Sequence, residues 1–216
     1  SSYFGQSFFR REGRPASVNR KPMMLFIGII CLGCHAVSRA QQVGTLEQEK
    51  GPTIPLKECT EAGCTGREMA MTLDANWRWV HKTSGYENCY TGNKWTGCSD
   101  NLQCARDCVL EGVTEDKYQN TYGISQIANG IKLSFVTEHK YGTNVGSRLY
   151  MLEKDGQNYK MFYLKNREFA MDFDVSEAQC GMNGAMYFIE MDEKGGKGRG
   201  NNQAGAKYGT GYCDAQ

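Results

Sequence analysis

Apolar and acidic side chains alternate along Glu168-Phe169-Ala170-Met171-Asp172-Phe173-Asp174-Val175. Because successive side chains of an extended chain point to opposite faces, the phenylalanines and the methionine would share one face, and Asp172 and Asp174 the other. This alternation predicts a β-strand that buries one face and exposes the other to water. Asp172 and Asp174 are therefore expected to be solvated, and neither is predicted to be catalytic.

Similar short runs occur elsewhere, separated by Gly, Asn, Asp and Ser, whereas helical periodicity is nearly absent. We predict further strands over residues 69–73, 131–136, 148–152, 159–164 and 185–189. The pair Asp155-Gly156 predicts a hairpin turn, residues 104–112 have room for one helical turn, and the Gly-rich tail over 195–211 is expected to be a long loop. Many strands with turns between them favour an all-β sandwich or jelly roll.

The composition is that of a globular protein: 216 residues, of which 23% are charged, can bury one core. Residues 1–40 carry six basic residues and one acidic residue, so the remainder is mildly acidic although the whole chain has a net charge of +1. With no basic stripe, the charge gives no reason to expect nucleic acid or an anionic membrane as a partner. We expect a partner that is uncharged or small.

An apolar run begins at Met23 and is followed by small residues shortly before Gln41. This pattern is typical of a secretory signal peptide, and the run is shorter than the roughly 20 apolar residues that cross a bilayer. The mature protein is therefore expected to be secreted to the extracellular space, free of the membrane after signal removal, and monomeric. The expected segments are an upstream extension or read-through over 1–22, a signal peptide over 23–40, and the mature chain over 41–216.

The chain has ten cysteines, two of which lie in the predicted signal peptide. Those two and His35 form a C-x-x-C-H haem-attachment pattern, which the apolar context makes a coincidence. In a secreted chain the other eight favour disulfides. A zinc site using Cys98, Cys104, Cys108 and His81 is the alternative, but no C-x-x-C pair occurs outside the signal peptide. We expect no metal and no cofactor.

Two tryptophans lie close together in Asp74-Ala75-Asn76-Trp77-Arg78-Trp79. In a strand, Trp77 and Trp79 would project from the same face. Two flat indole rings side by side suit the apolar C–H faces of sugar rings, because stacking buries apolar area without stranding polar groups. Both tryptophans could equally belong to the core. The spacing alone leaves the two interpretations open.

Six longer stretches are more specific: QQVGTL at 41–46, DANWRWVH at 74–81, NCYTGN at 88–93, NVGSRLY at 144–150, CGMNGAMYF at 180–188 and AGAKYGTGYCDAQ at 204–216. In order and approximate spacing they resemble glycoside hydrolase family 7, which contains cellobiohydrolases and endoglucanases. The resemblance implies an all-β jelly roll, incomplete in this chain, with long loops and few helical turns. Residues 41–216 would be the N-terminal part of its catalytic domain.

The resemblance also implies an activity, the hydrolysis of β-1,4-glucosidic bonds in cellulose with retention of configuration. Residues 144–148 and 206–211 favour a cellobiohydrolase. The alternatives are an endoglucanase of the same family or a non-catalytic glucan-binding jelly roll. The family's catalytic E-x-D-x-x-E motif is expected beyond Gln216, so no residue of this chain is predicted to be catalytic and the chain alone is expected to be inactive.

Twelve residues match substrate-contacting positions of the family, and cellulose or another β-1,4-glucan is the implied partner. Trp77 and Trp79 resemble stacking platforms toward the entrance of the cellulose tunnel. Polar residues matching those that hold glucose hydroxyls are Arg148, Asn183, Tyr187, Tyr212, Asp214 and Gln216. Less central matches are Asn76, Tyr90, Tyr122 and Asn144. For Tyr90 and Tyr122, a packing role is the alternative.

The resemblance pairs six of the cysteines: Cys59 with Cys64, Cys89 with Cys108, and Cys98 with Cys104. A further family bridge would join positions 44 and 109, which are Gly44 and Val109 here. That bridge is therefore expected to be absent. Cys180 and Cys213 would pair with partners beyond Gln216.

Overall fold

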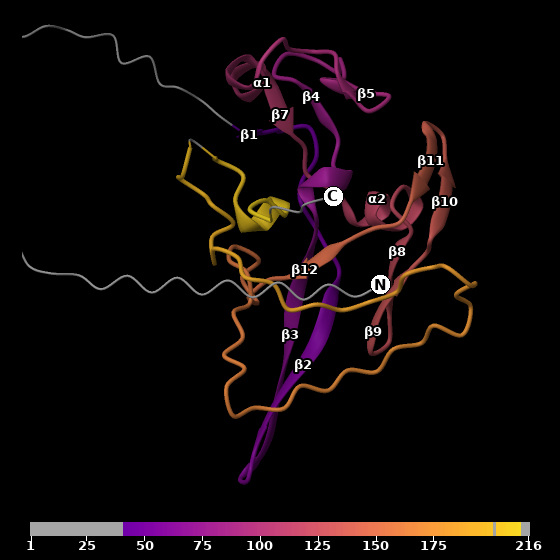
Figure 1. Ribbon diagram of the computed structural model, residues 1–216, viewed down its shortest axis with the longest axis vertical. Coiled ribbons are helices and arrows are strands. Elements are labelled where there is room, and N and C mark those ends of the chain that lie inside the picture. Colours follow the sequence, from indigo (N-terminus) through magenta and orange to yellow (C-terminus); the bar gives the residue numbers. More distant parts are fainter. Residues whose placement is uncertain (1–40, 201, 213–216) are drawn as a thin grey trace, which may run out of the picture. The chain divides into compact units, whose positions relative to one another are not determined.

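A computed structural model describes residues 41–200 and 202–212 (Figure 1). The signal peptide and the upstream extension expected over 1–40, and the predicted site residues Asp214 and Gln216, lie outside the described residues. The strands are β1 (Gln42–Val43), β2 (Thr53–Thr60), β3 (Gly63–Leu73), β4 (Val80–Lys82), β5 (Tyr90–Thr91), β6 (Lys94–Trp95), β7 (Cys108–Leu110), β8 (Ile124–Ile127), β9 (Gly130–Leu133), β10 (Val136–His139), β11 (Gly142–Val145) and β12 (Leu149–Met151). The helices are α1 (Asn101–Asp107) and α2 (Glu115–Asn120), with 3-10 turns η1 (Ala75–Trp77) and η2 (Ala206–Tyr208). The described part is therefore mostly β.

The longest strand, β3, is the centre of a three-stranded antiparallel sheet in the order β12-β3-β2. It pairs with β2 from Thr53↔Ala70 to Thr60↔Gly63, and with β12 at its C-terminal end, where Leu73 faces Leu149. A second sheet has the order β1-β7-β4, and three further pairs are the two-stranded ladders β5-β6, β8-β9 and β10-β11. The end of β3 thus pairs with a strand from a distant part of the sequence, β12.

Two groups of buried side chains flank the C-terminal half of β3. The first consists of Leu73, Val113, Tyr118, Tyr122 and Ile124, with Trp77, Ile131 and Leu149 packed against it. The second consists of Tyr150, Leu152, Tyr159 and Ala206, with Ala70, Met191 and Tyr212 packed against it. Both groups contain residues that adjoin the stretch from Asp74 to Trp79.

Three of the predicted strands are confirmed, in whole or in part. Residues 69–73 lie in β3, residues 131–133 of the predicted 131–136 lie in β9, and β12 occupies most of 148–152. The hairpin turn at Asp155-Gly156 is also confirmed, because the Gly156 amide donates to the Glu153 carbonyl and Leu152 forms an antiparallel bridge with Tyr159. In the described part of the tail, residues 195–200 and 202–211, the chain is a loop except for η2.

The strands predicted over 168–175 and 185–189 are wrong for the described residues, where these segments form no ladder. Of the strand predicted over 159–164, only Tyr159 pairs, in its isolated bridge with Leu152. A strand needs a hydrogen-bonding partner, and alternation says nothing about whether one is at hand. Phe173, expected to be buried, is 52% exposed. The helical turn expected over 104–112 is correct only to Asp107, because residues 108–110 pair with β1 and β4 instead.

The three implied disulfides are present, and they join Cys59 to Cys64, Cys89 to Cys108, and Cys98 to Cys104. Where the family bridge is missing, β1 runs parallel to β7 and the Gly44 amide donates to the Leu110 carbonyl over 2.9 Å. No helix in the described part of the chain is long and apolar enough to cross a membrane.

Candidate functional site

The two tryptophans follow β3, but they do not share a strand. The Asp74 carboxylate accepts a hydrogen bond from the Asn76 amide over 2.7 Å and thereby caps η1, which ends at Trp77. Arg78 is extended, and β4 begins only at Val80. The two tryptophans would share one face in a strand, but they are not in one, because the capped turn intervenes. Both rings are nevertheless half-buried, on either side of a buried arginine.

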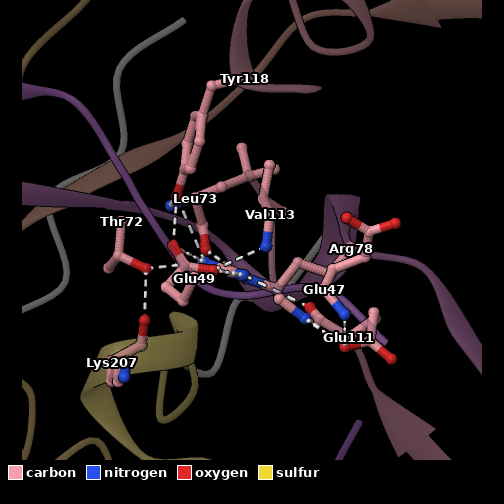
Figure 2. A network of polar contacts seen from close by, with 10 residues as sticks. Glu47, Glu49, Thr72, Leu73, Arg78, Glu111, Val113, Tyr118 and Lys207 are labelled. Carbon is pink, nitrogen blue, oxygen red and sulfur yellow. Dashed lines mark hydrogen bonds and ion pairs between the residues drawn. The ribbon is translucent and has the colours of Figure 1, made fainter. Parts of the chain in front are cut away.

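Arg78 anchors this stretch from the inside (Figure 2). Its side chain is 0% exposed, and its two terminal nitrogens bind the two carboxylate oxygens of Glu49. It also donates to the Thr72 hydroxyl over 2.7 Å and to the Leu73 carbonyl over 2.9 Å. Burial lowers the pKa of Arg78, but the hydrogen bond and charge of Glu49 outweigh burial and hold the pKa above its ordinary value.

Glu49 has several further partners in the same network (Figure 2). It accepts hydrogen bonds from the Tyr118 hydroxyl over 2.7 Å and from the Val113 amide over 2.9 Å. The Tyr118 oxygen in turn accepts the Leu73 amide over 2.9 Å. Burial, followed by the charge of Glu49, raises the pKa of Tyr118 well above its ordinary value, so the hydroxyl stays protonated. Both carboxylate oxygens of Glu49 are thus occupied by hydrogen bonds within the protein.

A second arginine, Arg148, brings predicted site residues together. Its Nε donates to the Asp74 carboxylate over 2.8 Å, and the Asp74 amide donates to the Arg148 carbonyl over 2.9 Å. The guanidinium carbon lies 4.5 Å from the centre of the Tyr212 ring and 5.5 Å from that of Trp77. Trp77, Arg148 and Tyr212 therefore form one cluster, in which a cation lies over two aromatic rings.

Tyr150 holds Asp74 from the buried side. Its hydroxyl donates to the same carboxylate oxygen that Arg148 binds, and its ring centre lies 6.1 Å from that of Tyr212. Burial raises the pKa of Tyr150, and the hydrogen bond and charge of Asp74 raise it further. Tyr150 therefore remains a hydrogen-bond donor, and Asp74, which is 2% exposed, connects the turn η1 to β12.

Trp79 has a different set of neighbours. Its Nε1 donates to the Asn88 side-chain oxygen over 2.7 Å, and the His81 ring stacks on it with a centroid distance of 4.0 Å. Tyr86 lies 6.1 Å away with its ring nearly parallel. Sequence reasoning did not single out Tyr86.

The remaining predicted site residues lie in several different parts of the structure. Asn76 is exposed on η1, and Asn144 donates to the Gly146 carbonyl over 2.9 Å. Trp77 donates to the Val145 carbonyl over 3.4 Å, so the 144–146 segment adjoins the cluster. Tyr122 belongs to the buried core, which favours the packing alternative for this residue.

Three predicted residues lie in exposed pairs. Tyr90 is exposed and contacts the edge of Trp95 across the β5-β6 ladder. Asn183 donates to the Tyr187 hydroxyl over 3.2 Å, and both side chains are exposed. Among the described contacts, neither pair touches the Trp77 ring. Glu49 and Arg78 were not singled out from the sequence either, because their contact is made by folding.

Most of the chain is similar to known proteins. Residues 43–216 match the profile of glycosyl hydrolase family 7. A family 7 cellobiohydrolase from Daphnia pulex is 45% identical, with a TM-score of 0.78 over 81% of this chain and 40% of its own. A cellobiohydrolase from Melanocarpus albomyces complexed with cellotetraose is 40% identical, with a TM-score of 0.70 over 82% of this chain and 41% of its own.

The Humicola insolens endocellulase EGI is 31% identical, with a TM-score of 0.68 over 81% of this chain and 44% of its own. The chain thus spans less than half the length of these solved structures. The expected fold, an all-β jelly roll that is incomplete in this chain, is confirmed by the likeness. Both the profile and the structural matches cover most of the sequence, and the chain belongs to glycosyl hydrolase family 7.

Proposed function

We propose that this chain holds a β-1,4-glucan for a secreted cellulase that cleaves cellulose with retention of configuration. The observation that carries the proposal is the cluster of Trp77, Arg148 and Tyr212 around the buried Asp74. Aromatic faces suit the apolar C–H faces of glucose rings, and a guanidinium offers several donors in one plane to vicinal hydroxyls. The cluster therefore combines the two kinds of contact that a glucan requires.

The cellobiohydrolase type is proposed over the endoglucanase type. The two cellobiohydrolases compared are 45% and 40% identical to this chain, whereas the endocellulase is 31% identical. One of these relatives is complexed with cellotetraose, which supports a glucan as the ligand. Secretion is part of the proposal, on the strength of the predicted signal peptide and of three disulfides. A monomeric state is proposed with it.

The catalytic carboxylates are proposed to belong to the parent protein outside these 216 residues. A retaining glycosidase needs two carboxyl groups about 5–5.5 Å apart, one acting as nucleophile and the other as acid and base. The three buried acids of the described part are each bound to a basic side chain: Asp74 to Arg148, Glu49 to Arg78, and Glu111 to His81. The E-x-D-x-x-E motif does not occur in the sequence.

The test is to measure glucan binding and hydrolysis separately. Calorimetric titration of the disulfide-bonded chain with cellohexaose is expected to show binding, and a reducing-sugar assay no cleavage. Trp77→Ala should lose about 1–2 kcal/mol of binding free energy, which is roughly 5–30-fold in Kd. The matched control is Trp95→Ala, because Trp95 is 54% exposed and outside the cluster. Equal effects of the two variants, or release of sugar by the chain alone, would contradict the proposal.

A further inference from the structure

Trp79 and Tyr86 have rings that lie in nearly parallel planes. Their centroids are 6.1 Å apart and the planes differ by 15°. Rings that eclipsed each other would be closer, so this separation means that they are displaced sideways, as in offset stacking. The two side chains therefore present adjacent aromatic surfaces with similar orientations.

The indole of Trp79 is held rigidly. Its Nε1 donates to the Asn88 side chain over 2.7 Å, and the His81 ring covers one face at a centroid distance of 4.0 Å. His81 is itself 2% exposed, with Nε2 2.8 Å from a Glu111 carboxylate oxygen and Nδ1 3.0 Å from the Gly85 carbonyl. A ligand would thus meet an indole whose orientation is already set.

Tyr86 lies at the exposed end of an ordered bend that follows β4. The Lys82 amide donates to the Glu87 carbonyl over 2.8 Å, and His81 forms a bridge with Asn88. Gly85 has a φ of +100°, a conformation that glycine adopts without strain, and it allows the sharp bend. These contacts position the backbone of Tyr86, while its ring remains 75% exposed. Covering that ring with an apolar ligand face would be favourable.

Exposure alone does not distinguish Tyr86, because Tyr163 is 78% exposed as well. What distinguishes Tyr86 is its alignment with the indole of Trp79, whose ring centre lies 6.1 Å from that of Tyr86. A polymer of linked pyranose rings needs a succession of such surfaces, whereas a single sugar needs only one. The alignment thus points to a chain-like ligand.

We propose that Tyr86 is a further stacking residue, and that a glucan chain lying on Trp79 continues onto the Tyr86 ring. This inference rests on the proposed function. In this arrangement the phenol hydroxyl, for which the described residues provide no hydrogen-bonding partner, donates to a glucose hydroxyl. Tyr86 thereby favours longer glucans, since only a ligand that extends past Trp79 reaches it.

Calorimetric titration of the 216-residue chain with cellotriose and cellohexaose tests this role. Tyr86→Ala should weaken cellohexaose binding by about five- to tenfold and cellotriose binding by much less. Tyr86→Phe keeps the ring and should lose about twofold or less. Tyr163→Ala is the matched control, because it removes a similarly exposed tyrosine that is not aligned with Trp79. It should leave both affinities unchanged.

The outcomes separate this inference from the proposed function. If Trp79→Ala weakens binding and Tyr86→Ala does not, the stacking role of Tyr86 is wrong while glucan binding stands. Tighter binding by Tyr86→Ala would show that Tyr86 shields the indole, which also overturns the inference. If the unmodified chain binds neither oligosaccharide, the proposed function itself fails, and the inference fails with it.

Discussion

Replacing Glu49 by alanine would leave the charge of Arg78 alone in the protein interior. The Arg78 side chain is 0% exposed and that of Glu49 is 6% exposed, so water cannot replace the lost carboxylate. Removing one partner of a buried ion pair costs about 3–5 kcal/mol. The Val113 amide and the Tyr118 hydroxyl also lose an acceptor, but contributions within one network are not additive. We therefore expect a total loss of about 3–5 kcal/mol.

Urea unfolding of the disulfide-bonded chain, followed by tryptophan fluorescence, measures this loss. With a slope of about 2 kcal/mol per molar urea, the midpoint should fall by roughly 2 M. Glu115→Ala is the control, because it breaks an ion pair with Lys50 whose side chains are 74% and 70% exposed. Exposed pairs contribute little, so this midpoint should not move. Similar midpoints for Glu49→Ala and Glu115→Ala would refute the reasoning.

A double variant separates the stranded charge from the lost contacts. If the cost comes mainly from an unpaired guanidinium, Glu49→Ala combined with Arg78→Met should be more stable than Glu49→Ala alone, because no charge is left behind. If the cost comes from the contacts that Arg78 makes with Thr72 and Leu73, the double variant should be less stable than either single one.

Two further predictions concern Gly44 and Asp192. A Cβ at Gly44 would overlap the Glu111 carboxylate, so Gly44→Ala should lower the free energy of unfolding by about 1–3 kcal/mol. Gly66→Ala is the control, because a Cβ there would lie 3.8 Å from its nearest neighbour. Equal Tm values for the two variants in thermal unfolding would contradict this prediction. The Gly196 amide, followed by that of Lys194, lowers the pKa of Asp192 below its ordinary 3.8. Because the pKa of Asp192 is lower in the folded protein, the ionised carboxylate contributes its full stabilisation above pH 3.8. That stabilisation is lost as the pH falls through the pKa of Asp192 in the folded protein. An NMR titration of the Gly196 amide should therefore show a midpoint below 3.8, and a midpoint at or above it would disprove the assignment.

Alternating side chains form a strand in this protein only where another strand lies beside them. Residues 69–73 were predicted as a strand, and they are one, because β2 and β12 lie on either side of them. Residues 168–175 alternate more regularly, yet they form no ladder in the described part of the chain. Alternation depends only on the segment's own residues, whereas a ladder depends on a partner strand elsewhere in the chain.

Among the site residues, too, some could be singled out from the sequence and others only from the structure. The resemblance to the family singled out Trp77, Arg148 and Tyr212, and the structure brings these three together. It did not single out Glu49 or Tyr86, because the role of each is created by folding. Glu49 reaches Arg78 from 29 residues away, and Tyr86 acquires its position from a bend closed by the His81–Asn88 bridge. Such roles can be recognised only once the partners are placed.

Two of the buried acids, Glu49 and Asp74, act on the same short stretch from different sides. Arg78 ties Glu49 to the Leu73 carbonyl, and Arg148 ties β12 to the Asp74 carboxylate that caps η1. Trp77 therefore lies on a turn that is held at both ends before any ligand arrives. Ordering a side chain at an interface costs about 0.5–1.5 kcal/mol, and here that cost falls on folding instead of binding. The Arg78–Glu49 pair is buried and the Arg148–Asp74 pair is partly buried, and such pairs add little to stability by themselves. Under the proposed function, their value lies in keeping the indole and the guanidinium in place for a glucan.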